Sequence, residues 1–195
     1  MASGDDIAVV LPVGTEGTLE ILENSYETLQ KRLSAGFLEE TRTACLESRL
    51  EIPGSRFGQI LEAAGKAGVH AYLPLEISGF LGGLWMMAEA SGTGLELDMR
   101  RIPVLQHTIE VCEVTGENPY MIPSGGSLLL ALKSGEAFCG ELRRSGIPAV
   151  CCGRANASND RLLFSGEIIR YLDKPPKELR PGYNPAGTEA EQEEK

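Results

Sequence analysis

The sequence has few of the residues from which metal centres and disulfide frameworks are built. It contains only two histidines, and its five cysteines form no Cys-x-x-Cys pair, so a zinc site is not expected. The odd number of cysteines instead predicts reduced, mostly buried thiols in a cytoplasmic protein. No apolar run approaches the roughly 20 residues that a membrane-spanning helix needs. Asp5 and Asp6 also interrupt any signal-peptide pattern, so neither a membrane protein nor a secreted one is expected.

Positive charge is also scarce. The 195 residues include 28 Asp and Glu against 18 Lys and Arg, which gives a formal net charge of −10. Residues 186–195 contribute −3 of this charge through four glutamates and one lysine, so the remainder is acidic without them. An acidic chain is repelled by phosphate backbones and anionic lipids, and we expect no nucleic-acid or membrane partner. The hydrophobic share of 42% and the charged share of 24% are typical of a globular domain.

Common catalytic signatures are missing as well. The glycines match neither the P-loop nor the dinucleotide-binding fingerprint, and no Gly-x-Ser-x-Gly, His-Glu-x-x-His or paired-Asp motif is present. These motifs carry the nucleophiles, bases and metal ligands of many hydrolases and metalloenzymes. The sequence therefore indicates no catalytic residue and no metal ligand of its own.

Hydrophobic periodicity predicts an α+β fold in which helices pack on one mixed sheet. Helices are expected where apolar residues recur at helical spacing between capping residues, prolines and glycines: 19–33, 38–45, 55–64 with Ser55 as cap, 81–91, 103–115 from Pro103, and 134–145. Strands are expected at 7–13, 69–73, 95–99, 127–132, 149–153, 161–164 and 167–171. The last three are predicted to be antiparallel, with a tight hairpin at Ser165–Gly166.

One domain accounts for most of the chain. We expect it to span residues 1–173, a usual domain size. Residues 174–195 hold four prolines followed by the acidic run. Such a segment cannot bury enough apolar surface to offset its ordering entropy, so it is predicted to be disordered.

Two glycine clusters, residues 78–83 and residues 124–127, could approach a phosphate or another anion. The first opens a predicted helix, where free amides and the helix dipole favour negative charge. The alternative is close helix packing for the first cluster and a strand-entry turn for the second. Two further polar residues each have two interpretations. Glu76 is either a ligand contact or a solvated carboxylate, and His70 is either a base or a hydrogen-bonded core histidine. The candidate ligand-binding residues are Glu76, Ser78, Gly79, Ser124, Gly125, Gly126 and Ser127, with His70 as a further candidate.

Several segments together resemble AIR synthase-related proteins, close to hydrogenase maturation factors of the carbamoyl-dehydratase type. The similar segments together span about residues 4–173 and occur in the same order as in the family. The set of segments is more specific to the family than any single segment. The similarity is carried by segments 5–18, 69–71, 82–92, 94–98, 102–104, 112–113, 118–120, 124–129, 146–149 and 159–161.

The resemblance implies the fold of the AIR synthase C-terminal domain, a mixed sheet with helices that is partly ferredoxin-like. In complete members an N-terminal domain supplies most of the ATP and metal site and the main dimer contacts. ATP lies between the two domains, and the reaction passes through a phosphorylated oxygen of the substrate. Met1 stands where the family's second domain begins, so the nucleotide-binding half is expected to be absent.

Two further departures concern reactive groups. Where relatives carry an Asp-x-Thr-x-Gly-Gly loop, this chain has Pro74, Glu76 and Ser78 at the Asp, Thr and first Gly positions. Proline removes a carboxylate and a backbone donor, and Glu76 adds negative charge near the expected phosphate. The C-terminal end also lacks the cysteine that accepts the carbamoyl group in the hydrogenase factors.

Three functional hypotheses follow. The leading one is a stand-alone, non-catalytic domain, a pseudoenzyme without cofactor, which binds a small anionic ligand or a protein partner and forms a homodimer over apolar surface. The alternative is one half of a split enzyme, which would use ATP and Mg²⁺ only with a separately encoded N-terminal domain. The third is a purely structural scaffold without ligand.

Overall fold

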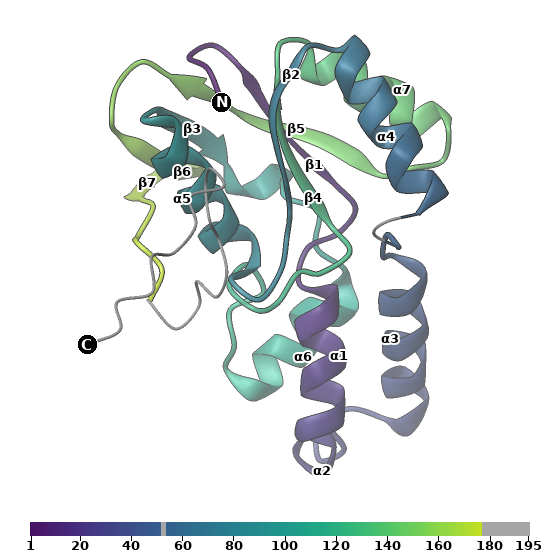
Figure 1. The fold of residues 1–195 in the computed structure, drawn as a ribbon. Helices are drawn as coiled ribbons and strands as arrows, with labels where there is room; N and C mark the ends of the chain where they lie inside the picture. The colour runs from purple at the N-terminus through teal and green to yellow at the C-terminus, as the bar shows by residue number, and fades with distance from the viewer. Residues whose placement is uncertain (52–53, 177–195) are drawn as a thin grey trace, which may run out of the picture.

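The computed structural model describes residues 1–51 and 54–176. Within them, seven strands form one mixed sheet (Figure 1). Their order across the sheet is β2 (Val69–Pro74), β4 (Leu128–Leu132), β1 (Asp6–Val10), β5 (Ala149–Asn156), β3 (Gly94–Asp98), β6 (Arg161–Ser165) and β7 (Ile168–Tyr171). All neighbours are antiparallel except β3 and β6, which run parallel.

The central strands are buried on both faces. All five residues of β4 are buried, as are Ile7 to Val10 of β1. Because successive side chains of a strand point to opposite faces, Ile7 and Val9 belong to one core cluster, and Ala8 and Val10 belong to another. The continuous apolar runs therefore reflect two cores, one on each side of the sheet.

Different helices cover the two faces. On one face, α5 (Gly79–Ser91) packs with the cluster that contains Ile7 and Val9. On the other face, α4 (Ser55–Lys66) and α7 (Gly135–Arg144) pack with the cluster that contains Ala8 and Val10. Both amphipathic helices lie along β2, β4 and β5 in the upper part of Figure 1.

The remaining α-helices of the described chain gather at one end of the sheet. They are α1 (Thr15–Asn24), α2 (Tyr26–Leu29), α3 (Ala35–Glu47) and α6 (Gln106–Thr115), below the sheet in Figure 1. Their shared core is a third apolar cluster: Leu19, Leu22, Leu29, Leu38, Cys45 and Val111. A short 3-10 turn, η1 (Met99–Arg101), links β3 to α6.

The predicted fold class is confirmed, whereas several predicted boundaries are wrong. The helix expected over 19–33 is broken at Ser25, whose φ of −127° leaves the helical region. Ser55 is the first helical residue of α4, and Gly54 holds the cap position. The helix expected from Pro103 begins at Gln106, because the carbonyl of Pro103 accepts a hydrogen bond from the amide of Val13.

Two strand predictions also need correction. The segment 7–13 pairs as a strand only to Val10, since Leu11 has a φ of +68°, which no extended strand adopts. β6 pairs antiparallel with β7, through the predicted hairpin with Gly166 at positive φ, but parallel with β3. β5, β6 and β7 thus alternate in direction as predicted, but β3 lies between β5 and β6, so the three strands are not consecutive neighbours in the sheet.

All five cysteines are free and buried, as predicted for reduced thiols. No described helix is long and apolar enough to cross a membrane. Of the predicted disordered tail, Lys174 lies with its Nζ 5.3 Å from the ring of Trp85, and residues 177–195 lie outside the described residues. That part of the prediction therefore stays a prediction.

Candidate functional site

The two glycine clusters lie side by side at the end of β2 and the start of β4. The amide of Ser124 donates to the carbonyl of Glu76 at 3.1 Å. The amide of Leu75 donates to the carbonyl of Ser127 at 2.9 Å. The pairing of β2 with β4 fixes this arrangement, because both loops are attached to the same end of that strand pair. We call residues 75–79 and 121–127 the glycine-loop face.

The start of α5 needs glycine for a steric reason. Gly79 has a φ of +64°, and a Cβ there would lie 2.7 Å from the backbone carbonyl oxygens of Met121 and Ile122. Its amide donates to the carbonyl of Glu76 at 3.0 Å. Ser78 is buried, but its side chain makes no capping hydrogen bond. Gly79 therefore permits close packing of the two loops, and its amide is already used within the chain.

The hydroxyls of the second cluster hold the turn before α1. Ser124 Oγ accepts a hydrogen bond from the amide of Gly14 at 2.9 Å and donates to the carbonyl of Ile122 at 3.2 Å. Ser127 Oγ donates to the carbonyl of Pro12 at 2.6 Å. Both serines are fully buried. Their hydroxyls therefore bind backbone, which ties the glycine loops to the end of β1.

A carboxylate of the chain itself occupies the glycine loop. Glu16 Oε2 accepts a hydrogen bond from the amide of Gly125 at 2.9 Å. Glu16 Oε1 lies 3.0 Å from Arg49 Nη2, and Arg49 Nε donates to the carbonyl of Gly125 at 3.0 Å. A backbone amide beside a guanidinium is a setting in which proteins bind anions. Here the bound anion is the side chain of Glu16.

The edge of the glycine-loop face is apolar. Ile77 and Met121 are 43% and 44% exposed, although both are large hydrophobic side chains. They line a hollow of about 330 Å³, together with Gly17, Glu20, Ile21, Glu117, Ile122 and Pro123. Exposed apolar side chains around a recess are typical of surfaces that associate with another protein.

His70 lies away from these loops in a different setting. Its Nδ1 lies 2.8 Å and 3.0 Å from the two carboxylate oxygens of Asp5, which is buried. The amide of Ala2 donates to the same carboxylate at 2.6 Å. His70 itself is exposed on β2, at a bulge between Val69 and Ala71. The described contacts fix the orientation of the imidazole ring and bring no nucleophile to it.

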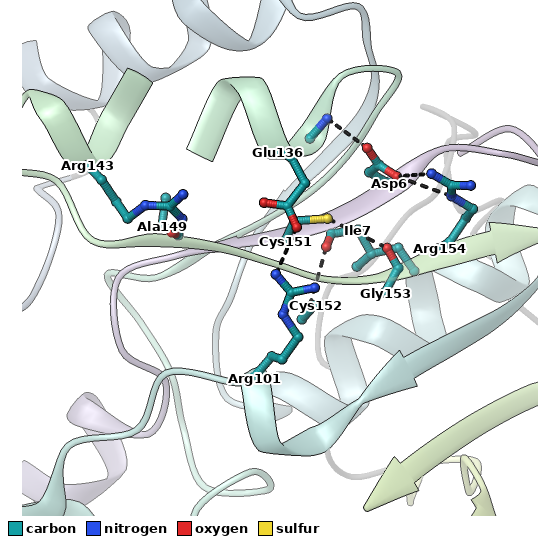
Figure 2. Close-up of polar contacts among 11 residues, drawn as sticks. Asp6, Ile7, Arg101, Glu136, Arg143, Ala149, Cys151, Cys152, Gly153 and Arg154 are labelled. Atoms are coloured by element: carbon teal, nitrogen blue, oxygen red, sulfur yellow. Dashed lines mark hydrogen bonds and ion pairs between the residues drawn. The ribbon is translucent and has the colours of Figure 1, made fainter. Parts of the chain in front are cut away.

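A charged cleft of about 600 Å³ opens beside β5, η1 and α7 (Figure 2). Arg101 Nη2 lies 2.8 Å from Glu136 Oε1, and Arg154 Nη2 lies 3.0 Å from Asp6 Oδ1. The other carboxylate oxygen of Asp6 accepts from the amide of Gly135 at 3.0 Å, at the start of α7. These arginines and carboxylates therefore neutralise one another within the cleft.

Burial disfavours the reactive thiolate form of the cysteines beneath this cleft. Burial, followed by the nearby Asp6 carboxylate, raises the pKa of Cys151 above its usual value. Burial also raises the pKa of Cys152, whose Sγ lies 3.4 Å from the carbonyl oxygen of Ile7 (Figure 2). Only a thiolate acts as a nucleophile, so neither cysteine is poised for covalent chemistry at neutral pH.

Sequence reasoning named both loops that the structure brings together, but it missed the two charged residues that meet them. Glu16 follows the turn after β1, and Arg49 lies beyond the end of α3. No spacing motif connects either residue to Gly125, which is 109 residues from Glu16 and 76 from Arg49. Glu76 is an exposed side chain whose backbone carbonyl, not its carboxylate, contacts the second loop.

The residues present do not by themselves fit ATP with Mg²⁺, the group that the resemblance implies. The amide of Gly125 and both serine hydroxyls of the second cluster already have partners in the chain. Among the described residues, no three His, Cys, Asp or Glu side chains gather as metal ligands. Hence we derive no reaction step through a nucleotide or metal.

Comparison with known folds agrees with this architecture. The chain resembles E. coli HypE, a hydrogenase maturation protein, at 20% identity and a TM-score of 0.68, covering 93% of this chain and 52% of that one. It resembles a chain of the HypE–HypF complex at 16% identity and a TM-score of 0.65, covering 90% of this chain and 54% of that one. It resembles thiamine monophosphate kinase from Aquifex aeolicus at 18% identity and a TM-score of 0.57, covering 89% of this chain and 53% of that one. The chain thus spans about half the length of these structures.

Sequence comparison identifies the family. No curated protein sequence matches the chain. The family model described as AIR synthase related protein, C-terminal domain, matches residues 58–163, more than half of the chain. This segment runs from α4 to β6 and includes both glycine clusters. The chain therefore belongs to the AIR synthase-related family, whose C-terminal domain it carries.

Proposed function

We propose that this chain is a non-catalytic binding module that receives a protein partner on its glycine-loop face. The observation that carries the proposal is the contact of the Glu16 carboxylate with the amide of Gly125 and the guanidinium of Arg49. A phosphate at this position would have to displace a carboxylate that is already paired and hydrogen-bonded. The negative charge of Glu16 would also repel it while it approached.

The surroundings of the loop favour a protein over a small anion there. Ile77 and Met121 present apolar surface at its edge, and burial of such surface stabilises protein association. The hydroxyls of Ser124 and Ser127 and the amide of Gly125 are bound within the chain, whereas a protein surface needs a matching shape and apolar area. The chain's five buried cysteines form no disulfide, which is usual in a cytoplasmic protein and supports that location.

The alternative is one half of a split ATP-dependent enzyme. One observation favours it: the chain covers about half the length of its structural neighbours. The complex of one of these, HypE, with HypF favours a protein partner under either proposal. In this proposal a separately encoded N-terminal domain would bring the ATP and Mg²⁺ site. It would dock on the glycine-loop face and withdraw Glu16 from Gly125, so that the loop could face the nucleotide.

A small anionic ligand is a second candidate, at a different place. A pocket of about 370 Å³ combines apolar walls from Leu81 and Leu163 with Arg100, Arg170 and Tyr120. Its volume falls in the usual range of ligand sites, and Arg170 favours a negatively charged molecule, whereas Arg100 is already paired with Asp98. An apolar carboxylate or phosphate ester would match this lining.

ATP turnover tests the proposal. The purified chain is expected to hydrolyse no ATP by itself, and addition of the separate N-terminal half of an AIR synthase-related protein is expected to leave it inactive. Turnover by the chain alone would contradict a non-catalytic module. Turnover only on mixing, lost in a Gly125→Val variant, would instead establish the split enzyme.

A further inference from the structure

The two outer strands of the sheet differ in how they are protected against pairing with another chain. The outer strand β2 has a bulge between Val69 and Ala71 and ends with Pro74, two features that disfavour further strand pairing. Its exposed Tyr72 contacts Phe57 of α4 with ring centroids 6.4 Å apart. The opposite edge strand, β7, has a regular register with β6 and contains no proline.

β7 also carries an unusual concentration of apolar surface. All four of its residues are exposed, and Ile168, Ile169 and Tyr171 are 55%, 58% and 68% exposed. An exposed hydrophobic edge strand is a site at which proteins pair with other strands. We propose that β7 pairs antiparallel with β7 of a second copy of this chain, across a two-fold axis, and so extends the sheet into the second subunit.

The backbone pattern determines which groups are available for this pairing. The amide of Leu172 donates to the carbonyl of Arg161, and alternate residues of an antiparallel strand share this inward orientation. Arg170 and Ile168 therefore also bond toward β6. Ile169 and Tyr171 direct their amide and carbonyl groups outward, where no strand of the described chain pairs with them.

Side chains then select one register among those the backbone allows. Pairing centred on Arg170 would place the two Arg170 side chains opposite each other and Glu167 opposite Asp173, and both contacts join like charges. Pairing centred on Ile168 would overlap fewer strand residues. Pairing centred on Ile169 places the two Ile169 side chains together and Ile168 opposite Arg170, without a like-charge contact.

A second copy suits this edge better than an unrelated chain for two reasons. Antiparallel pairing of identical strands is self-complementary, so each backbone donor of Ile169 meets the carbonyl of its counterpart. The chain is also strongly acidic, with a net charge of −10, so two copies repel one another except where apolar or uncharged surface meets. β7 and its hairpin offer such surface, because the positive charge of Arg170 balances the negative charge of Glu167.

Sedimentation equilibrium of the full chain tests the pairing. The chain is expected to dimerise, and Ile169→Lys is expected to raise the dimer dissociation constant at least about tenfold. Ile169→Pro removes the outward amide together with the isoleucine side chain and should act in the same direction. Leu46→Lys is the matched control, because Leu46 is similarly exposed, at 56%, on α3. A monomeric wild-type chain, or equal effects of Ile169→Lys and Leu46→Lys, would overturn the proposal.

Cross-linking tests the register independently of the affinity. All native cysteines are buried, so a short thiol-specific cross-linker should react with an introduced surface cysteine in preference to the native ones. Ile169→Cys is expected to cross-link efficiently to its counterpart, Arg170→Cys less so, and Leu46→Cys at the level of random collisions. Stronger cross-linking of Arg170→Cys than of Ile169→Cys would contradict this register. Since β7 lies outside the glycine-loop face, a failed dimer would leave the proposed function unaffected.

Discussion

The carboxylate of Glu16 lies 2.9 Å from the amide nitrogen of Gly125, at the centre of a loop whose sequence suggests an anion site. Arg49 completes the contact from the other side. The chain therefore supplies its own anion to the position that a phosphate could take. The chain keeps the fold of the AIR synthase-related C-terminal domain, and an internal ion pair closes the loop.

Removal of this carboxylate should cost stability. Glu16→Ala leaves Arg49 Nη2 and the amide of Gly125 without their partner, and we expect a loss of about 1–2 kcal/mol in the free energy of unfolding, since the pair is only half-buried. Urea denaturation measures this loss. Glu20→Ala, an exposed position one turn further along α1, should change stability by less than about 0.5 kcal/mol. Equal effects would show that the Glu16 contact contributes nothing.

Gly79 should be intolerant of any side chain. Gly79→Ala combines a φ of +64° with a Cβ 2.7 Å from two backbone carbonyl oxygens, so we expect a loss of at least about 2 kcal/mol. Gly140→Ala is the control, because no heavy atom lies within 4 Å of its new Cβ in helix α7. That change should stabilise the protein by about 0.5–1 kcal/mol. Thermal unfolding of both variants decides, and a tolerated Gly79→Ala would contradict the close packing of the loops.

Asp6 should matter more than its arginine partner. Its carboxylate accepts from the amide of Gly135 at the start of α7, and Arg154 is 69% exposed. We expect Asp6→Ala to cost about 1–2 kcal/mol, as for loss of a helix cap, and Arg154→Ala less than about 1 kcal/mol. Chemical denaturation compares the two. A larger loss for Arg154→Ala would mean that the ion pair, not the helix contact, is what stabilises this end of α7.

The buried thiols predict the pH dependence of stability. Burial raises the pKa of Cys45 and of Cys112 to about 11 each, and that of Cys139 to about 12, from 9.0. The folded state therefore binds these protons more tightly than the unfolded state. Stability should be independent of these thiols below pH 9 and should fall as the pH rises from 9 to about 12. Cys112→Ala should reduce the fall, and an unchanged slope would contradict burial as its cause.

Local signals predicted several elements well. Gly92 and Gly116 end α5 and α6 with positive φ, as glycines after a helix commonly do. The apolar run of β4 predicted a strand that the structure buries on both faces. Gly166 marked the β6–β7 hairpin. In each case the residues that determine the structure are neighbours in sequence.

Features that depend on distant contacts were not predictable in this way. The parallel pairing of β3 with β6 and the late start of α6 both follow from contacts between separate segments. Glu16 and Arg49 could not be predicted for the same reason, because they meet Gly125 only once the sheet has formed. The glycine loops could be named from sequence, but the carboxylate that fills one of them could not.

Calorimetric titration with ATP and with inorganic phosphate tests the central claim most directly. The wild-type chain should show no binding, Glu16→Ala should open the loop and bind phosphate through Gly125 and Arg49, and the double variant with Arg49→Ala should lose that binding again. Binding of either ligand by the wild-type chain at the glycine loop, unaffected by Glu16→Ala, would contradict the account.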